Sequence, residues 1–307
     1  MKTIRLLTLS TALYLPSLAA PLPAATTIDA ATPYAYGANI GWINCRGDVA
    51  NGAVVGEFVC SGSIYSANCG WISLGNGAPT NGIRYGNLSA TDYGVNTEQY
   101  FANGSTFEAK LRGYAYGANI GWIAFENTGN PRVNLSTGRL LGYAWGANVG
   151  WIALSETGVT VNTTMIAAGT DSDGDGIPDA WERLHAVSLS LMNASTDSDH
   201  DGILDKDEYA ADTEPFDAND YLRITILVAP RNVGGTGPFA TDLTWTSKPT
   251  RWYEIEATPS LLVAPATVAD QIAPGGVVTF DRFNDPLLLS IPAQRFYRVR
   301  AKLPLAP

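Results

Sequence analysis

Two short stretches of the chain place carboxylates at the same offsets. The first is "DSDGDGIPDAWE", residues 171–182, and the second is "DSDHDGILDKDE", residues 197–208. Both carry acidic residues at positions 1, 3, 5, 9 and 12 and a glycine at position 6. Two like charges ~4 Å apart repel by about 1 kcal/mol even in bulk water, so clusters of this kind need a cation.

This spacing is typical of a calcium-binding loop, which turns sharply at a glycine and gathers hard oxygen ligands around one ion. Position 7 supplies its backbone carbonyl, and position 9 acts directly or through a water molecule. The expected ligands are Asp171, Asp173, Asp175, Ile177, Asp179 and Glu182 in the first loop, and Asp197, Asp199, Asp201, Ile203, Asp205 and Glu208 in the second. The sequence therefore predicts two bound calcium ions.

The two loops resemble three known calcium modules: the EF-hand loop, the dockerin and the thrombospondin type 3 repeat. The last fits best by context, because its Asp-rich loops follow one another with little helix in secreted multidomain proteins. That resemblance implies structural calcium in an extracellular spacer.

Three departures separate the stretch from a paired EF-hand or a dockerin. The residues before Asp171 predict strand and loop where an EF-hand has its entering helix, and Pro178 removes a backbone donor at position 8. A dockerin normally closes with Asp where Glu182 and Glu208 stand. We therefore expect no sensor that opens a hydrophobic groove. A short helix is expected within residues 180–191, with Trp181 and Leu184 packing beneath the loops.

The acidity of the chain is concentrated in this module, which we place at residues 170–220. Residues 171–220 hold 15 of the 29 carboxylates and only two basic side chains, Arg183 and Lys206. The formal net charge of the whole chain is −10, which argues against nucleic acid as a partner, because phosphate binding needs a basic surface.

Upstream of the module, one phrase recurs four times, at residues 34–43, 64–72, 114–123 and 143–152, as in "YAYGANIGWI". Aromatic and small residues alternate around a Gly-Ala-Asn or Ser-Ala-Asn turn, which predicts strand hairpins. Repeated units of this kind bury a face against their neighbours, so residues 27–165 should form an all-β repeat domain. The phrase resembles repeats of exported bacterial surface proteins that lack an assigned activity.

The tryptophans of the repeats have two interpretations. Because a bulky residue that recurs at one position of a repeat usually fills its core, we expect buried side chains at Trp42, Trp71, Trp122 and Trp151. Flat aromatic faces also stack on sugars, and the better candidates for exposed, ligand-binding aromatics are Tyr34, Tyr114 and Tyr143.

Residues 221–307 contain at least five β-rich runs separated by Gly and Pro, which predicts a small antiparallel β-sandwich of immunoglobulin or fibronectin type III character. The stretch "LTWTSKPTRWYEIEAT" with the later "RFYRVR" resembles the C-terminal domain that follows Asp-rich calcium loops in many secreted bacterial proteins. The resemblance implies an architecture and no catalytic residues. The predicted fold class is mainly β throughout.

The first 25 residues are typical of an export signal. Lys2 and Arg5 precede an apolar run and then small residues, with cleavage expected between Ala19 and Ala25. The run is too short for a good membrane span, and no later segment reaches spanning length. Disulfides persist outside the cell, and Cys45–Cys60 is the preferred pair. Cys69 would then stay free or bond to another molecule.

No nucleophile motif, phosphate loop or zinc ligand set is present in the sequence. The leading hypothesis is a non-enzymatic, secreted or cell-surface calcium-binding structural or adhesion protein. Calcium would rigidify a spacer between two β domains, and the partner would be an extracellular protein or glycan. The alternative is a carbohydrate-binding module that uses the repeat-domain aromatics, and a polysaccharide-active enzyme is the third hypothesis.

Overall fold

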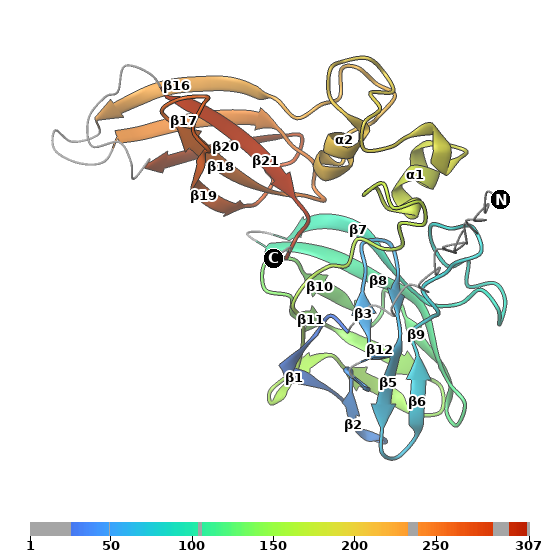
Figure 1. Cartoon of the computed structure of the whole chain (residues 1–307). Helices are drawn as coiled ribbons and strands as arrows, with labels where there is room; N and C mark the ends of the chain where they lie inside the picture. The colour runs from blue at the N-terminus through green and yellow to red at the C-terminus, as the bar shows by residue number, and fades with distance from the viewer. Residues whose placement is uncertain (1–25, 49, 104–105, 233–238, 285–294, 306–307) are drawn as a thin grey trace, which may run out of the picture.

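The computed structural model describes residues 26–48, 50–103, 106–232, 239–284 and 295–305. The predicted signal peptide lies outside the described residues. Within them the chain is mainly β, as predicted, and its α-helices are two short ones, α1 (Asp179–His185) and α2 (Asp205–Ala211). In Figure 1 the repeat domain lies below and the C-terminal domain above, with α2 near the C-terminal domain and α1 above the repeat domain.

Each of the four repeats forms one antiparallel hairpin. The eight strands of these hairpins are β1 (Ile28–Gly37), β2 (Gly41–Asn44), β5 (Ser63–Ser66), β6 (Gly70–Ser73), β8 (Thr106–Gly117), β9 (Gly121–Phe125), β12 (Tyr143–Gly146) and β13 (Gly150–Ala153). Neighbouring hairpins pair in chain order, and β13 pairs with β1, so the sheet closes on itself. Closure removes the free edges that an open sheet would expose.

Seven further strands complete the repeat domain. They are β3 (Val54–Val55), β4 (Cys60–Ser61), β7 (Val95–Asn103), β10 (Arg132–Asn134), β11 (Leu140–Leu141), β14 (Ser155–Glu156) and β15 (Val159–Thr163). β7 and β10 both pair with the long strand β8, and β15 pairs with the start of β1. The longer interval between the second and third repeats therefore supplies β7 and the loops before it.

A ring of side-chain hydrogen bonds links the turns of the four hairpins. The asparagine of each turn donates its amide to the backbone carbonyl of the preceding hairpin's turn, at 3.0 to 3.1 Å: Asn68 to Ile40, Asn119 to Cys69, Asn148 to Ile120 and Asn39 to Val149. The acceptor residues are buried. The repeated asparagine is explained by this ring, which ties neighbouring repeats together at one end of the closed sheet.

The repeat tryptophans lie outside the closed sheet, which corrects the expectation that they fill its core. Trp42, Trp71, Trp122 and Trp151 are 43 to 52% exposed, whereas the isoleucine that follows each of them is at most 3% exposed. Successive residues of a strand face opposite sides of a sheet, so only one of each Trp-Ile pair can point inward. The β-branched isoleucines and small alanines fill the interior instead.

The predicted Cys45–Cys60 disulfide is also wrong, because all three cysteines are buried free thiols. Cys45 and Cys60 belong to the apolar core, and the Sγ of Cys60 lies 3.8 Å from the hydroxyl of Thr97. Cys69 occupies the turn position that Ile40, Ile120 and Val149 fill in the other repeats. The cysteines therefore serve as small apolar core residues.

The C-terminal domain consists of two antiparallel three-stranded sheets in its described residues. One contains β16 (Ile224–Asn232), β17 (Phe239–Thr246) and β20 (Val278–Asn284), and the other β19 (Ala266–Ile272), β18 (Trp252–Thr258) and β21 (Phe296–Lys302). Both sheets contribute to one apolar core that includes Leu243, Trp245, Tyr253 and Ile255. The predicted sandwich is confirmed.

Between the two β domains, the acidic module contains α1, the single 3₁₀ turn Leu189–Leu191 and α2. As predicted, no helix precedes Asp171 in the described segment from residue 164 onward. Trp181 is buried, but Leu184 is half exposed, so only the tryptophan packs beneath the loops. None of the helices in the described part of the chain is long and apolar enough to cross a membrane.

Candidate metal centres

The first acidic loop is folded by hydrogen bonds from its own backbone. The carboxylate of Asp171 accepts the amides of Gly174 and Gly176 at 2.8 and 2.9 Å, and Asp175 Oδ1 accepts the amide of Ile177 at 2.8 Å. Gly176 has a φ of 91°, a conformation that favours glycine. These contacts bring one carboxylate oxygen each of Asp171, Asp173 and Asp175 within 4.8 Å of one another.

The second loop repeats this geometry at every equivalent position. Asp197 accepts the amides of His200 and Gly202 at 2.8 and 3.0 Å, and Asp201 Oδ1 accepts the amide of Ile203 at 2.7 Å. Carboxylate oxygens of Asp197, Asp199 and Asp201 again lie within 4.8 Å of one another. His200 adopts a positive φ of 68° where the first loop has Gly174 at 77°. Equal spacing in the sequence has therefore produced two equivalent acidic clusters.

The glutamates that close the loops are buried carboxyl groups, and among the described residues only the Thr213 hydroxyl bonds to either of them, at 3.4 Å from Glu208 Oε1. Glu182 and Glu208 lie in the first turns of α1 and α2, and both are fully buried. Six buried carboxylate oxygens have no hydrogen-bond partner among the described residues. They are both oxygens of Glu182, Oε2 of Glu208, and Oδ2 of Asp175, Asp199 and Asp201. Buried polar atoms are almost always paired, so these oxygens need a ligand.

The electrostatics agree with that geometry. Burial, with the nearby aspartates as the second cause, raises the pKa of Glu182 to about 7 and the pKa of Glu208 to about 8. Burial likewise raises the pKa of Asp175 and Asp199. Each cluster therefore favours either proton uptake or a cation, and at neutral pH a divalent cation neutralises more of its charge.

Position 9 of each loop is hydrogen-bonded to the serine at position 2. Both oxygens of Asp179 accept hydrogen bonds from Ser172, from its amide at 2.7 Å and its hydroxyl at 2.6 Å. Asp205 accepts the same pair from Ser198, at 3.0 and 2.9 Å, and a further bond from the Thr196 hydroxyl. Asp179 and Asp205 thus brace their loops, and the serine at position 2 was the overlooked sequence signal for this contact. Both aspartates lie outside the two three-aspartate clusters and stay predicted ligands, directly or through a water molecule.

An all-oxygen site of this kind fits calcium. Each loop offers three aspartates and a buried glutamate, and the backbone carbonyls of Ile177 and Ile203 stay predicted ligands. Calcium takes six to eight oxygen ligands in flexible geometry, whereas zinc prefers nitrogen and sulfur. The residues present therefore fit the ion that the spacing predicts.

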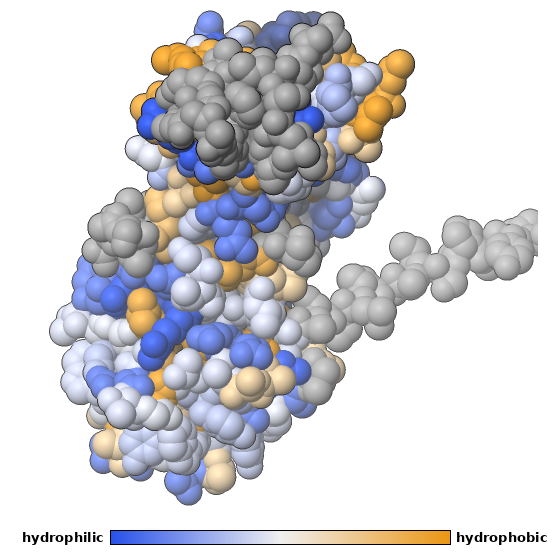
Figure 2. Space-filling view, turned by 90° about the vertical axis from the view of Figure 1, so that its left-hand side faces the viewer, coloured by the Kyte–Doolittle hydropathy of each residue, from blue (hydrophilic) through white to orange (hydrophobic). Residues whose placement is uncertain are grey.

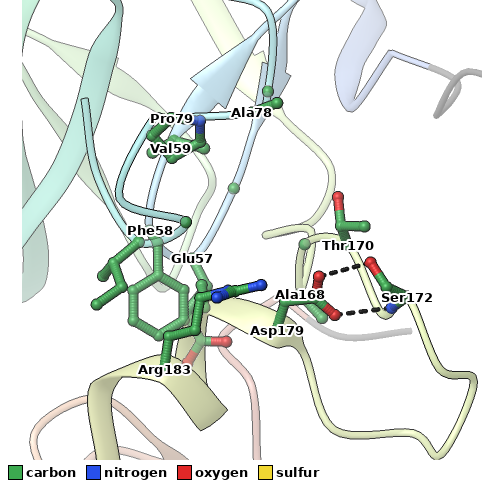
Figure 3. Close-up of a pocket in the computed structure, with 16 residues that line it drawn as sticks. Glu57, Phe58, Val59, Ala78, Pro79, Ala168, Thr170, Ser172, Asp179 and Arg183 are labelled. Carbon is green, nitrogen blue, oxygen red and sulfur yellow. Dashed lines mark hydrogen bonds between the residues drawn. The ribbon is translucent and has the colours of Figure 1, made fainter. Parts of the chain in front are cut away.

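The module packs directly against the repeat domain. Ile177, Trp181, Met192 and Tyr209 form an apolar cluster with Phe58, which lies between β3 and β4 of the repeat domain. A pocket of about 240 Å³ remains beside this contact, where Arg183 of α1 lies near Phe58 and the Asp179–Ser172 pair faces Thr170 (Figure 3). The acidic module is thus a packed element of the molecule and not an extended spacer.

One arginine of the C-terminal domain joins all three parts of the chain. Arg251 is fully buried, and its Nη1 donates to Glu57 Oε1 of the repeat domain at 2.7 Å. The same guanidinium donates to the carbonyls of Tyr209 and Ala210 in α2, at 2.8 and 3.0 Å. The Tyr209 hydroxyl donates to Glu57 Oε2 at 3.1 Å. Arg251 and Glu57 are 194 residues apart in the chain, so no local sequence pattern could have predicted that they form a pair.

Asp212, at the end of α2, connects the two loops to this junction. It accepts Nε1–H of Trp181, from α1, at 3.2 Å, and it also accepts the hydroxyl of Thr250. Its Oδ1 lies 3.8 Å from Nη2 of Arg251. The helix that leaves the second loop therefore ends in contacts with the C-terminal domain, and the helix that leaves the first loop is tied to that end through Trp181.

The two β domains also touch each other. The rings of Phe107 and Trp252 meet edge to face with centroids 6.4 Å apart, and Leu305 packs on the repeat-domain core. The domains are thus joined by a direct contact and by the acidic module together.

The predicted ligand aromatics occupy three different hairpins. Tyr34 is exposed, and Tyr114 and Tyr143 are half buried. Each lies against the tryptophan of its own repeat. The structure therefore does not bring the three tyrosines together into one site.

Comparisons with known proteins add no relative: no family model matches the chain, and neither a curated protein nor a solved structure matches it.

Proposed function

We propose that the chain is a secreted, calcium-binding structural protein in which two ions lock the acidic module and the two β domains into one arrangement. One observation carries the proposal. Both buried oxygens of Glu182, and Oε2 of Glu208, have no hydrogen-bond partner within the described residues and lie in loops that each gather three aspartates. Leaving such charges uncompensated in the interior is costly, and a calcium ion at each loop would pair them.

The way in which calcium would act follows from the helices behind the loops. Glu208 would bind the second ion, and the next residue, Tyr209, contacts Glu57 and Arg251. Glu182 would bind the first ion, and its neighbour Trp181 donates to Asp212. Fixing the first turn of each helix thus supports the contacts with the β domains. Calcium here would be a structural ion whose loss loosens the junction.

The expected affinity suits an extracellular location. Calcium sites of extracellular modules bind with Kd values on the order of 10⁻⁴–10⁻³ M, because the ion is abundant there. The export signal and the resemblance to thrombospondin type 3 loops support the same location. Binding at ~100 times Kd stabilises a protein by about 2.7 kcal/mol per site. Two sites would therefore raise the melting temperature by about 10–20 °C in a chain of this size.

Isothermal titration of the full secreted chain with calcium tests the proposal. We expect two bound ions in the wild type and one in each of the variants Glu182→Gln and Glu208→Gln. Asp207→Asn is the matched control, because Asp207 is exposed and adjoins Glu208 but is not a predicted ligand. It should keep both ions. No binding heat at millimolar calcium, or two ions retained by both glutamine variants, would reject the calcium sites.

The locking role has a separate readout. Small-angle X-ray scattering with and without calcium should show a narrower distribution of domain separations in the presence of the ion. The same comparison on Glu208→Gln should show a smaller change. Equal scattering profiles with calcium and with a chelator would reject the locking role while leaving the binding sites intact.

A further inference from the structure

The outer face of the closed sheet carries a regular set of aromatic pairs. Directly opposite residues of the four hairpins form them: Tyr36 with Trp42, Tyr65 with Trp71, Tyr116 with Trp122, and Trp145 with Trp151. All eight side chains are between 37 and 52% exposed. Because the sheet interior is filled by other residues, this aromatic set is not needed for the core, and its exposure calls for another explanation.

Three of the four tryptophans are held in the same orientation by a tyrosine of their own repeat. Tyr34 meets Trp42 edge to face with ring centroids 6.1 Å apart, and Tyr114–Trp122 and Tyr143–Trp151 do so at 6.2 Å. The interplanar angles are 74° and 75°. In the second repeat, Ser63 occupies the position of that tyrosine. Three indoles are therefore fixed platforms, and Trp71 is a natural internal contrast.

Small residues separate the aromatic ridges. Where neighbouring hairpins pair, an alanine of one hairpin lies opposite an aromatic residue of the next: Ala124 opposite Trp145, and Ala153 opposite Tyr36. Beside the three supported tryptophans lie grooves of about 530, 420 and 210 Å³, which contain Trp42, Trp122 and Trp151 respectively. Grooves of this size suit a small ligand or a short stretch of polymer rather than a protein surface.

The groove beside Trp151 shows the chemistry most clearly. Two indoles, Trp145 and Trp151, and the ring of Tyr143 form its apolar walls, while Glu126 and Thr128 give it a polar rim. The other two grooves combine aromatic rings with Thr, Ser and Asn side chains. No Lys or Arg lines any of the three grooves in the part of the chain that the structure describes. In Figure 2 the repeat domain is the lower part of the molecule, and its visible face is mostly hydrophilic to neutral, with scattered hydrophobic residues.

We propose that these three grooves bind an uncharged glycan, with the pyranose rings stacked on Trp42, Trp122 and Trp151. The C–H groups on one face of a pyranose carry partial positive charge and are attracted to the negative face of an indole. The hydroxyls at the ring edge would bond to the polar rim. Acidic glycans are disfavoured because the groove beside Trp151 offers the carboxylate of Glu126, and none of the three grooves offers a cation in the described part of the chain. Three grooves around one domain would also give avidity for a polymer.

The test uses the full secreted chain and a panel of neutral hexasaccharides: cellohexaose, xylohexaose, mannohexaose and chitohexaose. Binding is followed by isothermal titration, first in calcium and then in a chelator. We expect at least one of the four to bind in both conditions, since the grooves lie in the repeat domain. Failure of the calcium titration would therefore leave this result unaffected, and the reverse also holds.

Variants identify the grooves. The triple change Trp42→Ala, Trp122→Ala and Trp151→Ala should weaken binding at least tenfold, whereas Trp71→Ala should stay within twofold of the wild type. Trp151→Phe keeps a smaller ring and should give an intermediate loss at its groove, which controls for any disturbance by the alanine changes. No binding by any neutral hexasaccharide would overturn the proposal. So would equal losses for Trp71→Ala and Trp151→Ala, or tighter binding of polygalacturonate than of every neutral glycan.

Discussion

Replacing Arg251 by methionine removes a side chain that contacts all three parts of the chain. In the wild type its guanidinium bonds to the Glu57 carboxylate and to two carbonyls of α2. Both charged side chains are almost fully buried, at 0 and 5% exposure. Methionine has a similar length and no charge, so the change leaves the Glu57 carboxylate buried without its counter-charge.

The expected cost follows from that uncompensated charge. Removing one partner of a buried ion pair typically costs ~3–5 kcal/mol. Burial already raises the pKa of Glu57, with Arg251 as the main opposing influence, so the variant should raise that pKa further. Glu57→Gln should also be destabilising, because it leaves the arginine unpaired. The double variant should cost less than the sum of the single changes, by about 2–3 kcal/mol.

Urea unfolding of the full chain in saturating calcium, followed by tryptophan fluorescence, measures these free energies. The control is Arg282→Met, which removes a pair with Asp242 in which the arginine side chain is 57% exposed and the aspartate side chain is 9% exposed. A pair with one partner in water should cost less to break than the fully buried pair of Arg251 and Glu57. Additive effects of Arg251→Met and Glu57→Gln, or a loss for Arg251→Met no larger than for Arg282→Met, would refute the reasoning about the junction.

Three further outcomes are expected. In a chelator, stability should fall as the pH rises from about 4.5 toward about 8, because the folded state favours the protonated forms of Glu182 and Glu208, whose pKa values are raised to about 7 and 8. Melting curves should show this slope, and the double variant Glu182→Gln, Glu208→Gln should flatten it. An equal slope in that variant would count against the assignment. Gly176→Ala should weaken calcium binding at the first loop by ~1–2 kcal/mol in a titration, because alanine is strained at a φ of 91°. The control is Gly158→Ala, which introduces a similar strain in the turn between β14 and β15 and should leave the calcium affinity unchanged. Finally, the thiols should resist a disulfide reagent until the chain unfolds, because burial raises the pKa of Cys45 to about 12 and of Cys60 to about 11. Rapid labelling in the native state, or a Cys45–Cys60 bond in the intact mass, would contradict the buried-thiol assignment.

The features that the sequence predicted well are those with a local cause. The spacing of Asp171, Asp173 and Asp175 and the glycine that follows were enough to place three carboxylates together. The β hairpins follow from residue alternation and from the turn signals between strands. The sandwich in the C-terminal domain follows in the same way from its β-rich runs.

The errors concern choices that local sequence does not determine. Alternation in "GWIN" or "GWIA" shows that Trp and Ile face opposite sides, but it does not say which side is the interior. The recurrence of Trp suggested burial, whereas the recurring Ile and the small residues around it were the better guide to the core. The hydrogen bonds of Asp179 and Asp205 to the serines were missed, although Ser172 and Ser198 stand at the same position of both loops.

The domain junction was beyond sequence reasoning for a physical reason. Glu57, Tyr209 and Arg251 meet only because the closed sheet, the acidic module and the sandwich fold and then pack together. No periodicity links these positions, and each alone is an ordinary polar residue. The same holds for the asparagine ring, whose members recur visibly but whose acceptors lie on other hairpins.

The most direct measurement is an anomalous difference map from crystals of the full chain grown in calcium and then exchanged with a lanthanide. We expect two peaks, one beside Glu182 and one beside Glu208, and in the calcium form metal–oxygen distances of about 2.3–2.6 Å to the neighbouring aspartates. A well-phased map in saturating ion with no peak at either loop, and with both glutamates paired to protein groups instead, would contradict this expectation.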